Sequence, residues 1–300
     1  MRKSAEGPFE RMESESGIVW FDPDYRPRLE AVGLRSFSDW MALARVEYRE
    51  VSMRPKRPVV AIEVTGIPGA LFVKRHLEPP RAETLAQKLG LAPRATEARK
   101  EVEKLALFSH AGIPVPQVIV WGEGRREGSE VLSFVVTLDL EGLPLERHLF
   151  HSWAPPLSPE AVKDKRRTIE EVGRLAARMH RAGLVHRDFY LGHIFVVKPK
   201  GSSTPPRLAV IDVQRASRRP GWWVRSRIKD LASLHFSADP VYIRPVDRIR
   251  FLRTYWKTER FSWWQRLQIR WIVRKAGRIR KHTEKALGIP YSEYFKNKYY

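Results

Sequence analysis

The chain has 300 residues, of which 43% are hydrophobic and ten are tryptophan, so it can bury a sizeable core and is not a disordered chain. It contains no cysteine, which excludes disulfides and thiolate metal sites. Its formal net charge of +21 favours an anionic partner.

The beginning of the chain has basic residues but no apolar stretch behind them, and no run approaches the ~18 apolar residues that a membrane span needs. We therefore expect a soluble, cytoplasmic protein. Its length suits one large domain or two lobes.

The N-terminal third predicts a small β-rich region. Residues 1–28 read as a mainly polar, loosely held extension with one short edge strand at 18–21, and Ser38 is a possible N-cap for a short helix. Two apolar runs, 59–64 and 71–76, are joined by a turn with two glycines and predict a hairpin.

Lys74 lies near the end of this hairpin, where kinases place the lysine that binds the α- and β-phosphates of the nucleotide. A helix is expected over 96–108, ending at Gly112 with prolines beyond. A glutamate of this helix could pair with Lys74, and the candidates are Glu97, Glu101 and Glu103. Two further strands are expected at 118–122 and 131–137.

The larger, mainly helical part follows a link at 138–142. Ser158 as N-cap and Pro159 at the first position begin a long helix that Gly183 ends. One face of that helix is apolar, at Ile169, Val172, Leu175, Ala176 and Met179.

Directly after this helix, two apolar runs flank a polar loop that contains His186, Arg187 and Asp188. A third apolar run ends abruptly at Asp212, and the turn-rich segment 198–206 between the runs can close a hairpin. Two carboxylates therefore stand at the ends of neighbouring strands. This arrangement suits phosphoryl transfer, in which one acid orients the attacking hydroxyl and the other holds Mg²⁺ on the phosphates of ATP.

The C-terminal segment 213–300 is strongly basic, with 22 Lys and Arg against six Asp and Glu, and it holds six of the ten tryptophans. Such a pattern suits nucleic acid or an anionic membrane surface, and it also fits a solvated basic face over core tryptophans. From Ser262 the sequence predicts an amphipathic helix, to about His282, in which Arg266, Arg270, Arg274 and Arg278 recur every four residues.

The complete pattern resembles the lipopolysaccharide core kinases, the heptose and Kdo kinases of protein-kinase-like fold. The resemblance is carried by residues 186–193 (HRDFYLGH), 210–216 (VIDVQRA) and 227–232 (RIKDLA), and it covers most of the chain from 18 to 282. Tyr190, two residues after the aspartate, and His193, five after it, distinguish this family from ordinary protein kinases.

The resemblance implies an α+β, bilobal, protein-kinase-like fold, with an N-lobe at 29–140 and a C-lobe at 141–300. It implies that Asp188 orients and deprotonates a sugar hydroxyl, that Asp212 holds Mg²⁺, and that Lys74, braced by Glu101, binds the phosphates of ATP. His193 stands where protein kinases place a second metal ligand, but imidazole suits Mg²⁺ poorly, so one metal is expected and His193 should bond the loop backbone or Asp188. His186 and Asp230 are expected to brace the loop.

The sequence thus predicts an ATP- and Mg²⁺-dependent kinase of an inner-core sugar on lipid A, a glycolipid, bound peripherally at the inner face of the cytoplasmic membrane. Nucleic acid is not the expected partner, and the sequence does not define the oligomeric state. Two alternatives stay open: an atypical protein kinase, and a non-catalytic, kinase-shaped adaptor that binds anionic lipid or nucleic acid. The joint presence of Lys74, Asp188 and Asp212 argues against the adaptor.

Overall fold

The computed structural model describes residues 9–78, 95–125, 131–197, 207–218, 223–290 and 293. The chain divides into two compact units, the first made of residues 1–107 and 116–139 and the second of residues 108–115 and 140–300. The change of unit at Asp139 and Leu140 lies within the link expected between two lobes.

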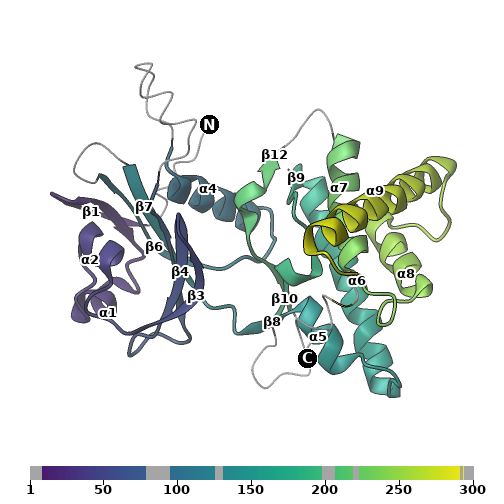
Figure 1. Cartoon of the computed structure of the whole chain (residues 1–300), viewed down its shortest axis with the longest axis horizontal. Coiled ribbons are helices and arrows are strands. Elements are labelled where there is room, and N and C mark those ends of the chain that lie inside the picture. The colour runs from purple at the N-terminus through teal and green to yellow at the C-terminus, as the bar shows by residue number, and fades with distance from the viewer. Residues whose placement is uncertain are drawn as a thin grey trace. The chain divides into compact units, whose positions relative to one another are not determined.

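The first unit is built on a seven-stranded sheet in which all neighbouring strands are antiparallel (Figure 1). Its strand order is β1-β2-β6-β7-β5-β4-β3. The strands are β1 (Glu10–Ser14), β2 (Gly17–Phe21), β3 (Tyr48–Arg54), β4 (Arg57–Ile62), β5 (Leu71–His76), β6 (Val118–Arg125) and β7 (Val131–Leu138). The helices of this unit are α1 (Arg26–Ala31), α2 (Phe37–Ala42) and α4 (Glu97–His110), whose last residues belong to the second unit.

Both faces of the sheet are covered, which explains the continuous apolar runs of its central strands. Phe134 and Val136 of β7 pack in one core with α1 and α2, whereas Val135, between them, packs in a second core with α4. In the second core, the rings of Trp20 and Trp121 stack with centroids 3.9 Å apart.

Two expectations for this region were wrong. Residues 10–21 are not a loosely held extension, because β1 and β2 form a hairpin that continues the sheet through β6. Successive side chains at 19–21 are buried on alternate faces, so β2 is an inner strand. The N-cap of α2 is Ser36 rather than Ser38, because Ser36 accepts from the Asp39 amide while Asp39 accepts from the Ser36 amide at 2.7 Å.

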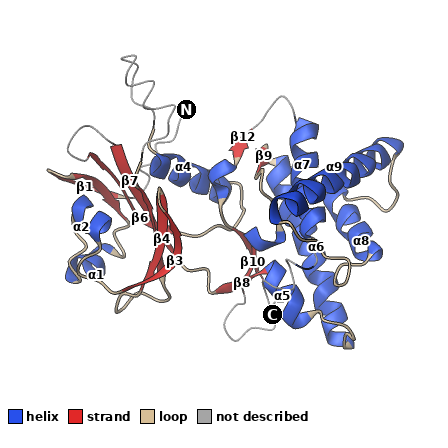
Figure 2. Ribbon diagram, in the orientation of Figure 1, coloured by secondary structure: helices blue, strands red, loops and turns tan. Residues whose placement is uncertain are grey.

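The second unit is mainly helical (Figure 2). Its helices are α5 (Leu145–Ser152), α6 (Pro159–Arg181), α7 (Trp223–Ser237), α8 (Pro245–Trp256) and α9 (Trp263–Leu287). Two short 3₁₀ turns, η1 (Leu191–His193) and η2 (Val213–Arg215), follow strand-flanked loops. Its small sheets pair β8 (Gly142–Pro144), β10 (Ile194–Val197) and β11 (Arg207–Val210) in the order β11-β10-β8, and β9 (Leu184–Val185) with β12 (Ser217–Arg218).

Helix α6 is the centre of this unit and follows the sequence closely. Ser158 accepts a hydrogen bond from the Ala161 amide at 3.2 Å, and the chain leaves the helix through Gly183 at φ +80°. The expected apolar face is buried, and α6 packs against α8 while α7 packs against α9. The connector expected at 198–206 lies outside the described residues, but β10 and β11, which it joins, are antiparallel as expected. Among the described residues, no helix has the length and apolar content required to cross a bilayer.

Candidate active site

The loop that carries Asp188 is fixed from beneath by a buried carboxylate. Asp230 of α7 is fully buried, and its two oxygens accept from the backbone amides of His186 and Arg187, each at 2.7 Å. Such charge-assisted bonds are stronger than neutral ones. They hold the two residues before Asp188 against α7, with Arg187 in the left-handed region at φ +71°.

Two histidines beneath the loop are held uncharged by burial. His180, the last buried residue of α6, lies with Nε2 3.3 Å from Asp230 and Nδ1 2.7 Å from the hydroxyl of Tyr255. Burial lowers the pKa of His180 and of His186, although Asp230 opposes the shift in both. The support below the loop is therefore a hydrogen-bonded network built around the buried side chain of Asp230.

The same network connects the loop to the strand that ends at Asp212. His186 donates from Nε2 to the carbonyl of Ile211 at 2.9 Å, and the Ile211 amide donates to the carbonyl of His193 at 3.0 Å. Asp212 itself is in the left-handed region at φ +55°. The two expected carboxylates are therefore held in one hydrogen-bonded frame, as their positions at strand ends predicted.

Asp188 keeps part of its carboxylate available. Its Oδ1 accepts from the guanidinium of Arg215 at 3.0 Å, and no hydrogen bond to Oδ2 is found among the described residues. The Asp188 side chain is 16% exposed, whereas that of Arg215 is 60% exposed. An ion pair with so exposed a partner is weak and can rearrange, so it does not block the carboxylate.

His193 and Asp212 show how this unit could hold a metal ion. The Nδ1 of His193 lies 2.8 Å from the carbonyl of Asp188, which is the backbone bond expected of this residue, and its Nε2 lies 4.0 Å from Asp212 Oδ2. A carbonyl oxygen can only accept, so Nδ1 of His193 donates the hydrogen of this bond. No cluster of three or more ligating side chains occurs among the described residues. Mg²⁺ commonly uses one or two carboxylates plus phosphates and water, so Asp212, with 43% of its side chain exposed, fits it.

The first unit contains the lysine–glutamate pair that the sequence predicted as a candidate. Lys74 on β5 donates to Glu101 on α4 at 2.6 Å, with the glutamate side chain 1% exposed and the lysine 20% exposed. Of the three glutamates that the sequence offered, Glu97 instead pairs with Lys100 at 2.8 Å. A buried carboxylate fixes the ammonium group in one position while leaving it partly accessible.

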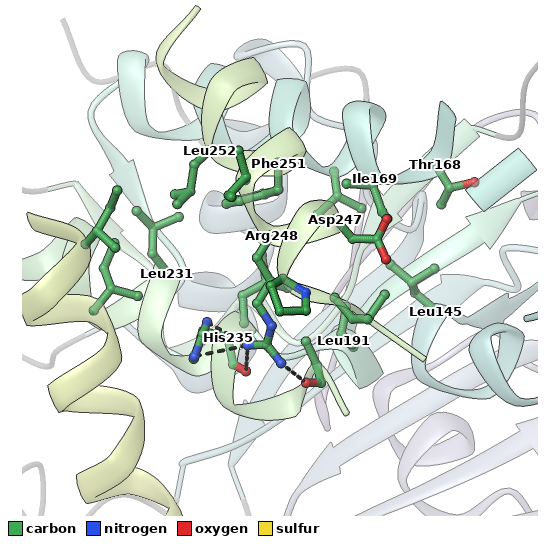
Figure 3. Close-up of a pocket in the computed structure, with 18 of the residues that line it drawn as sticks. Leu145, Thr168, Ile169, Leu191, Leu231, His235, Asp247, Arg248, Phe251 and Leu252 are labelled. Carbon is green, nitrogen blue, oxygen red and sulfur yellow. Dashed lines mark hydrogen bonds between the residues drawn. The ribbon is translucent and has the colours of Figure 1, made fainter. Parts of the chain in front are cut away.

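The second unit also contains a partly open, mainly apolar cavity of about 270 Å³ between α5, α6, α7, α8 and α9. Aliphatic and aromatic side chains line it, among them Ile169, Leu231 and Phe251 (Figure 3). The polar residues of its lining are Thr168, His235, Asp247 and Arg248. Arg248 donates to His235 at 2.7 Å and to the carbonyl of Ala238 at 2.7 Å. Burial, followed by the charge of Arg248, lowers the pKa of His235 to about 4, so His235 is a neutral acceptor.

Sequence reasoning missed three features of this region: the support from His180 and Tyr255, the Arg215 contact, and the cavity. His180 carried a usable signal, because it lies on the apolar side of α6 one turn before Gly183. The partners of these contacts have no local signature, because Arg215 lies 27 positions from Asp188 and Tyr255 lies 75 positions from His180.

The first unit has an antiparallel sheet with a lysine held by a glutamate. The second has a supported His-Arg-Asp loop and an aspartate at the end of a strand. These features are typical of a phosphotransferase of protein-kinase-like fold. Residues 80–255 match the model of the lipopolysaccharide kinase (Kdo/WaaP) family. The chain belongs to this family, and it is an enzyme that phosphorylates a sugar hydroxyl of the lipopolysaccharide core.

Individual relatives agree with this assignment. The chain is 33% identical over 217 residues to the lipopolysaccharide core heptose(I) kinase WaaP of Pseudomonas aeruginosa, covering 72% of this chain and 78% of that protein. It is 28% identical over 224 residues to the WaaP of Escherichia coli K12, covering 74% and 82%. A solved structure of WaaP in complex with acyl carrier protein matches with a TM-score of 0.62 and 28% identity, over 87% of this chain and 98% of that one.

Proposed function

We propose that the chain transfers the γ-phosphoryl group of ATP to a hydroxyl of the first heptose of the lipopolysaccharide inner core. The observation that carries this proposal is the Asp188 loop, which Asp230 and His186 hold in place while one carboxylate oxygen has no partner among the described residues. The choice of heptose follows the names of the curated relatives, which are heptose(I) kinases.

Each candidate residue then has one task. Asp188 accepts a hydrogen bond from the sugar hydroxyl and takes its proton as the oxygen attacks the γ-phosphorus, and ADP leaves. Lys74, held by Glu101 at 2.6 Å, binds the phosphates of the nucleotide. Asp212 would hold Mg²⁺, which would neutralise negative charge on the phosphates of the nucleotide. His193 orients the loop through the Asp188 carbonyl.

The proposed acceptor sits on lipid A, so the proposed place of action is the inner face of the cytoplasmic membrane, with the enzyme bound peripherally. The strongly basic composition supports this, because a net charge of +21 attracts an anionic glycolipid. No Ala-Pro-Glu segment of the kind that seats peptide substrates follows Asp212, which ranks sugar above protein as acceptor.

The test is incubation with labelled ATP and isolated core lipid, followed by mass mapping of the added phosphate. We expect the label on heptose, with peptides and denatured proteins labelled poorly. Efficient labelling of a peptide with inert core lipid would establish the protein-kinase alternative. Nucleotide binding without transfer to any acceptor would establish the adaptor.

A second proposed activity is binding of an acyl carrier protein, because the matched structure of WaaP is a complex with that protein. The apolar cavity supports this, because about 270 Å³ of aliphatic and aromatic lining suits a lipid chain and little else in the proposed reaction. Acyl-loaded and unloaded carrier protein should differ in affinity for this chain, and Val172→Phe, which fills the cavity, should remove that difference. Equal affinity for both carrier forms would exclude the cavity as an acyl site.

A further inference from the structure

Helix α9 is anchored along a narrow edge. Gln268, Ile272 and Ala276 recur every four residues and are its buried positions, each at most 5% exposed. The helix packs on α7 through this edge. Ser262 and Gln265 close its N-terminus with a capping box, and Gly288 follows its last residue at φ +73°. The helix is therefore firmly placed, with most of its circumference turned away from the core.

The outward side of α9 carries charge that the described part of the protein does not neutralise. Measured from Ile272 at about 100° per residue, Arg270 and Arg274 lie about 160° away and Arg266 and Arg278 about 120° away. All four are exposed, and none forms an ion pair with a described residue. Like charges at a spacing of four residues destabilise a helix, so folding alone does not account for this row.

Three tryptophans in the first half of α9 lie on or beside this outward side. Trp263 lies about 180° from Ile272 by the same measure and is 76% exposed, while Trp264 and Trp271 lie about 80° and 100° away, on one flank, and are 39% and 40% exposed. Their rings touch one another, with centroids 5.7 Å apart for the first pair and 5.6 Å for Trp264 and Trp271. Trp264 and Trp271 are therefore covered by protein on one side and exposed on the other, next to the row of arginines.

The combination of exposed tryptophan and arginine favours a membrane surface over other anionic partners. Indole combines an apolar body with one hydrogen-bond donor and is enriched where membrane and water meet. Arginine adds attraction to lipid phosphates on the same helix face. An acidic protein or a nucleic acid would account for the arginines, but it gives less reason for three neighbouring indoles to be held in water.

We propose that the outer face of α9, defined as Trp263, Trp264, Arg266, Arg270, Trp271, Arg274 and Arg278, docks the protein on an anionic membrane. The arginines bind lipid headgroups and the indoles enter the interface. This inference deepens the proposed function, since a lipid-held acceptor requires the enzyme to reach a bilayer. Vesicle binding needs no ATP and no core sugar, so the two proposals can fail independently.

The experiment is co-sedimentation with phosphatidylcholine vesicles that contain or lack about 30% phosphatidylglycerol, at low and at high salt. The variant changes Arg266, Arg270, Arg274 and Arg278 to Gln. Each basic residue near an anionic leaflet contributes on the order of 1 kcal/mol, so the variant should bind anionic vesicles up to about a thousandfold more weakly. Trp263→Ala, at a side chain 76% exposed, should fold normally and weaken binding several-fold even at high salt.

The matched control changes four exposed basic residues of α6, Lys163, Arg166, Arg167 and Arg178, to Gln, and it should retain most of the binding. Circular dichroism verifies that both charge variants keep their helices. An equal loss in the α6 control would show that overall charge, not α9, binds the membrane. Retained vesicle binding in the α9 variant, together with lost binding to acyl carrier protein, would make this face a protein-docking surface and overturn the proposal.

Discussion

At the scale of single residues, two aspartates of the site have different tasks: Asp188 is placed to act on the substrate, and Asp230 holds the loop that carries Asp188. Asp188 keeps an oxygen without a partner among the described residues, whereas both oxygens of Asp230 accept backbone amides at 2.7 Å. Both are aspartates of one network, yet burial and hydrogen bonding give them different tasks. A carboxylate saturated with backbone donors cannot also accept a substrate proton.

Substitutions of Asp188 and Asp212 should differ in their effects. Asp188→Asn should lower turnover by at least roughly a hundredfold, the scale of general acid–base assistance, while leaving nucleotide binding nearly unchanged. Asp212→Asn should weaken both Mg-ATP binding and turnover. Steady-state kinetics and nucleotide titration of each variant measure these effects. Near-normal phosphoryl transfer by Asp188→Asn would remove Asp188 from the proton-transfer role.

At the scale of elements, helices α6 and α8 are joined by a buried ion pair. Lys165 Nζ lies 2.7 Å from Asp247 Oδ2, with side chains 6% and 9% exposed, and also donates to the carbonyl of Tyr242. Asp247 further accepts from the Arg244 amide at 3.0 Å and so caps α8. Breaking a buried pair costs far more than replacing both of its members, because the remaining charge stays buried.

Lys165→Met should therefore lower the free energy of unfolding by about 3–5 kcal/mol, as for other broken buried pairs. Adding Asp247→Leu should recover much of that loss, because no unpaired buried charge is then left. About 1 kcal/mol should stay lost, because Asp247 also caps helix α8. Urea unfolding of the single and double variants measures the coupling. Additive losses in the double variant would show that the pair is not what joins these helices.

The elements also show what the sequence can predict. Helix α6 has a local signal at every point, from Ser158 and Pro159 to Gly183, and its bounds and buried face agree with expectation. Strand β3 has no such local signal in the sequence, because its side chains are exposed or half-buried and the strand depends on pairing with β4. The aspartates at strand ends were predictable for the same local reasons, whereas contacts such as that of His180 with Tyr255 depend on how distant helices pack.

At the scale of the whole molecule, several histidines are buried in an uncharged state. Burial is the main cause of a lowered pKa for His180, His186, His235 and His76. His76, beside the Lys74–Glu101 pair, has a pKa lowered from 6.5 to about 4 by burial, although Glu101 opposes the shift. In the unfolded chain these groups regain their ordinary pKa near 6.5.

This difference makes the protein sensitive to acid. Between pH 6.5 and about 4 the unfolded chain binds protons at His76 and His235 that the folded chain does not bind. Stability is therefore complete above pH 6.5 and decreases as the pH falls, by up to about 1.4 kcal/mol per pH unit for each such histidine. Urea unfolding at a series of pH values should show this slope. His76→Gln should make the dependence of the unfolding free energy on pH shallower, by up to about 1.4 kcal/mol per pH unit. His282→Gln, at an exposed position of α9, should leave this dependence unchanged. If His76→Gln kept the full slope, the acid sensitivity would arise elsewhere in the chain.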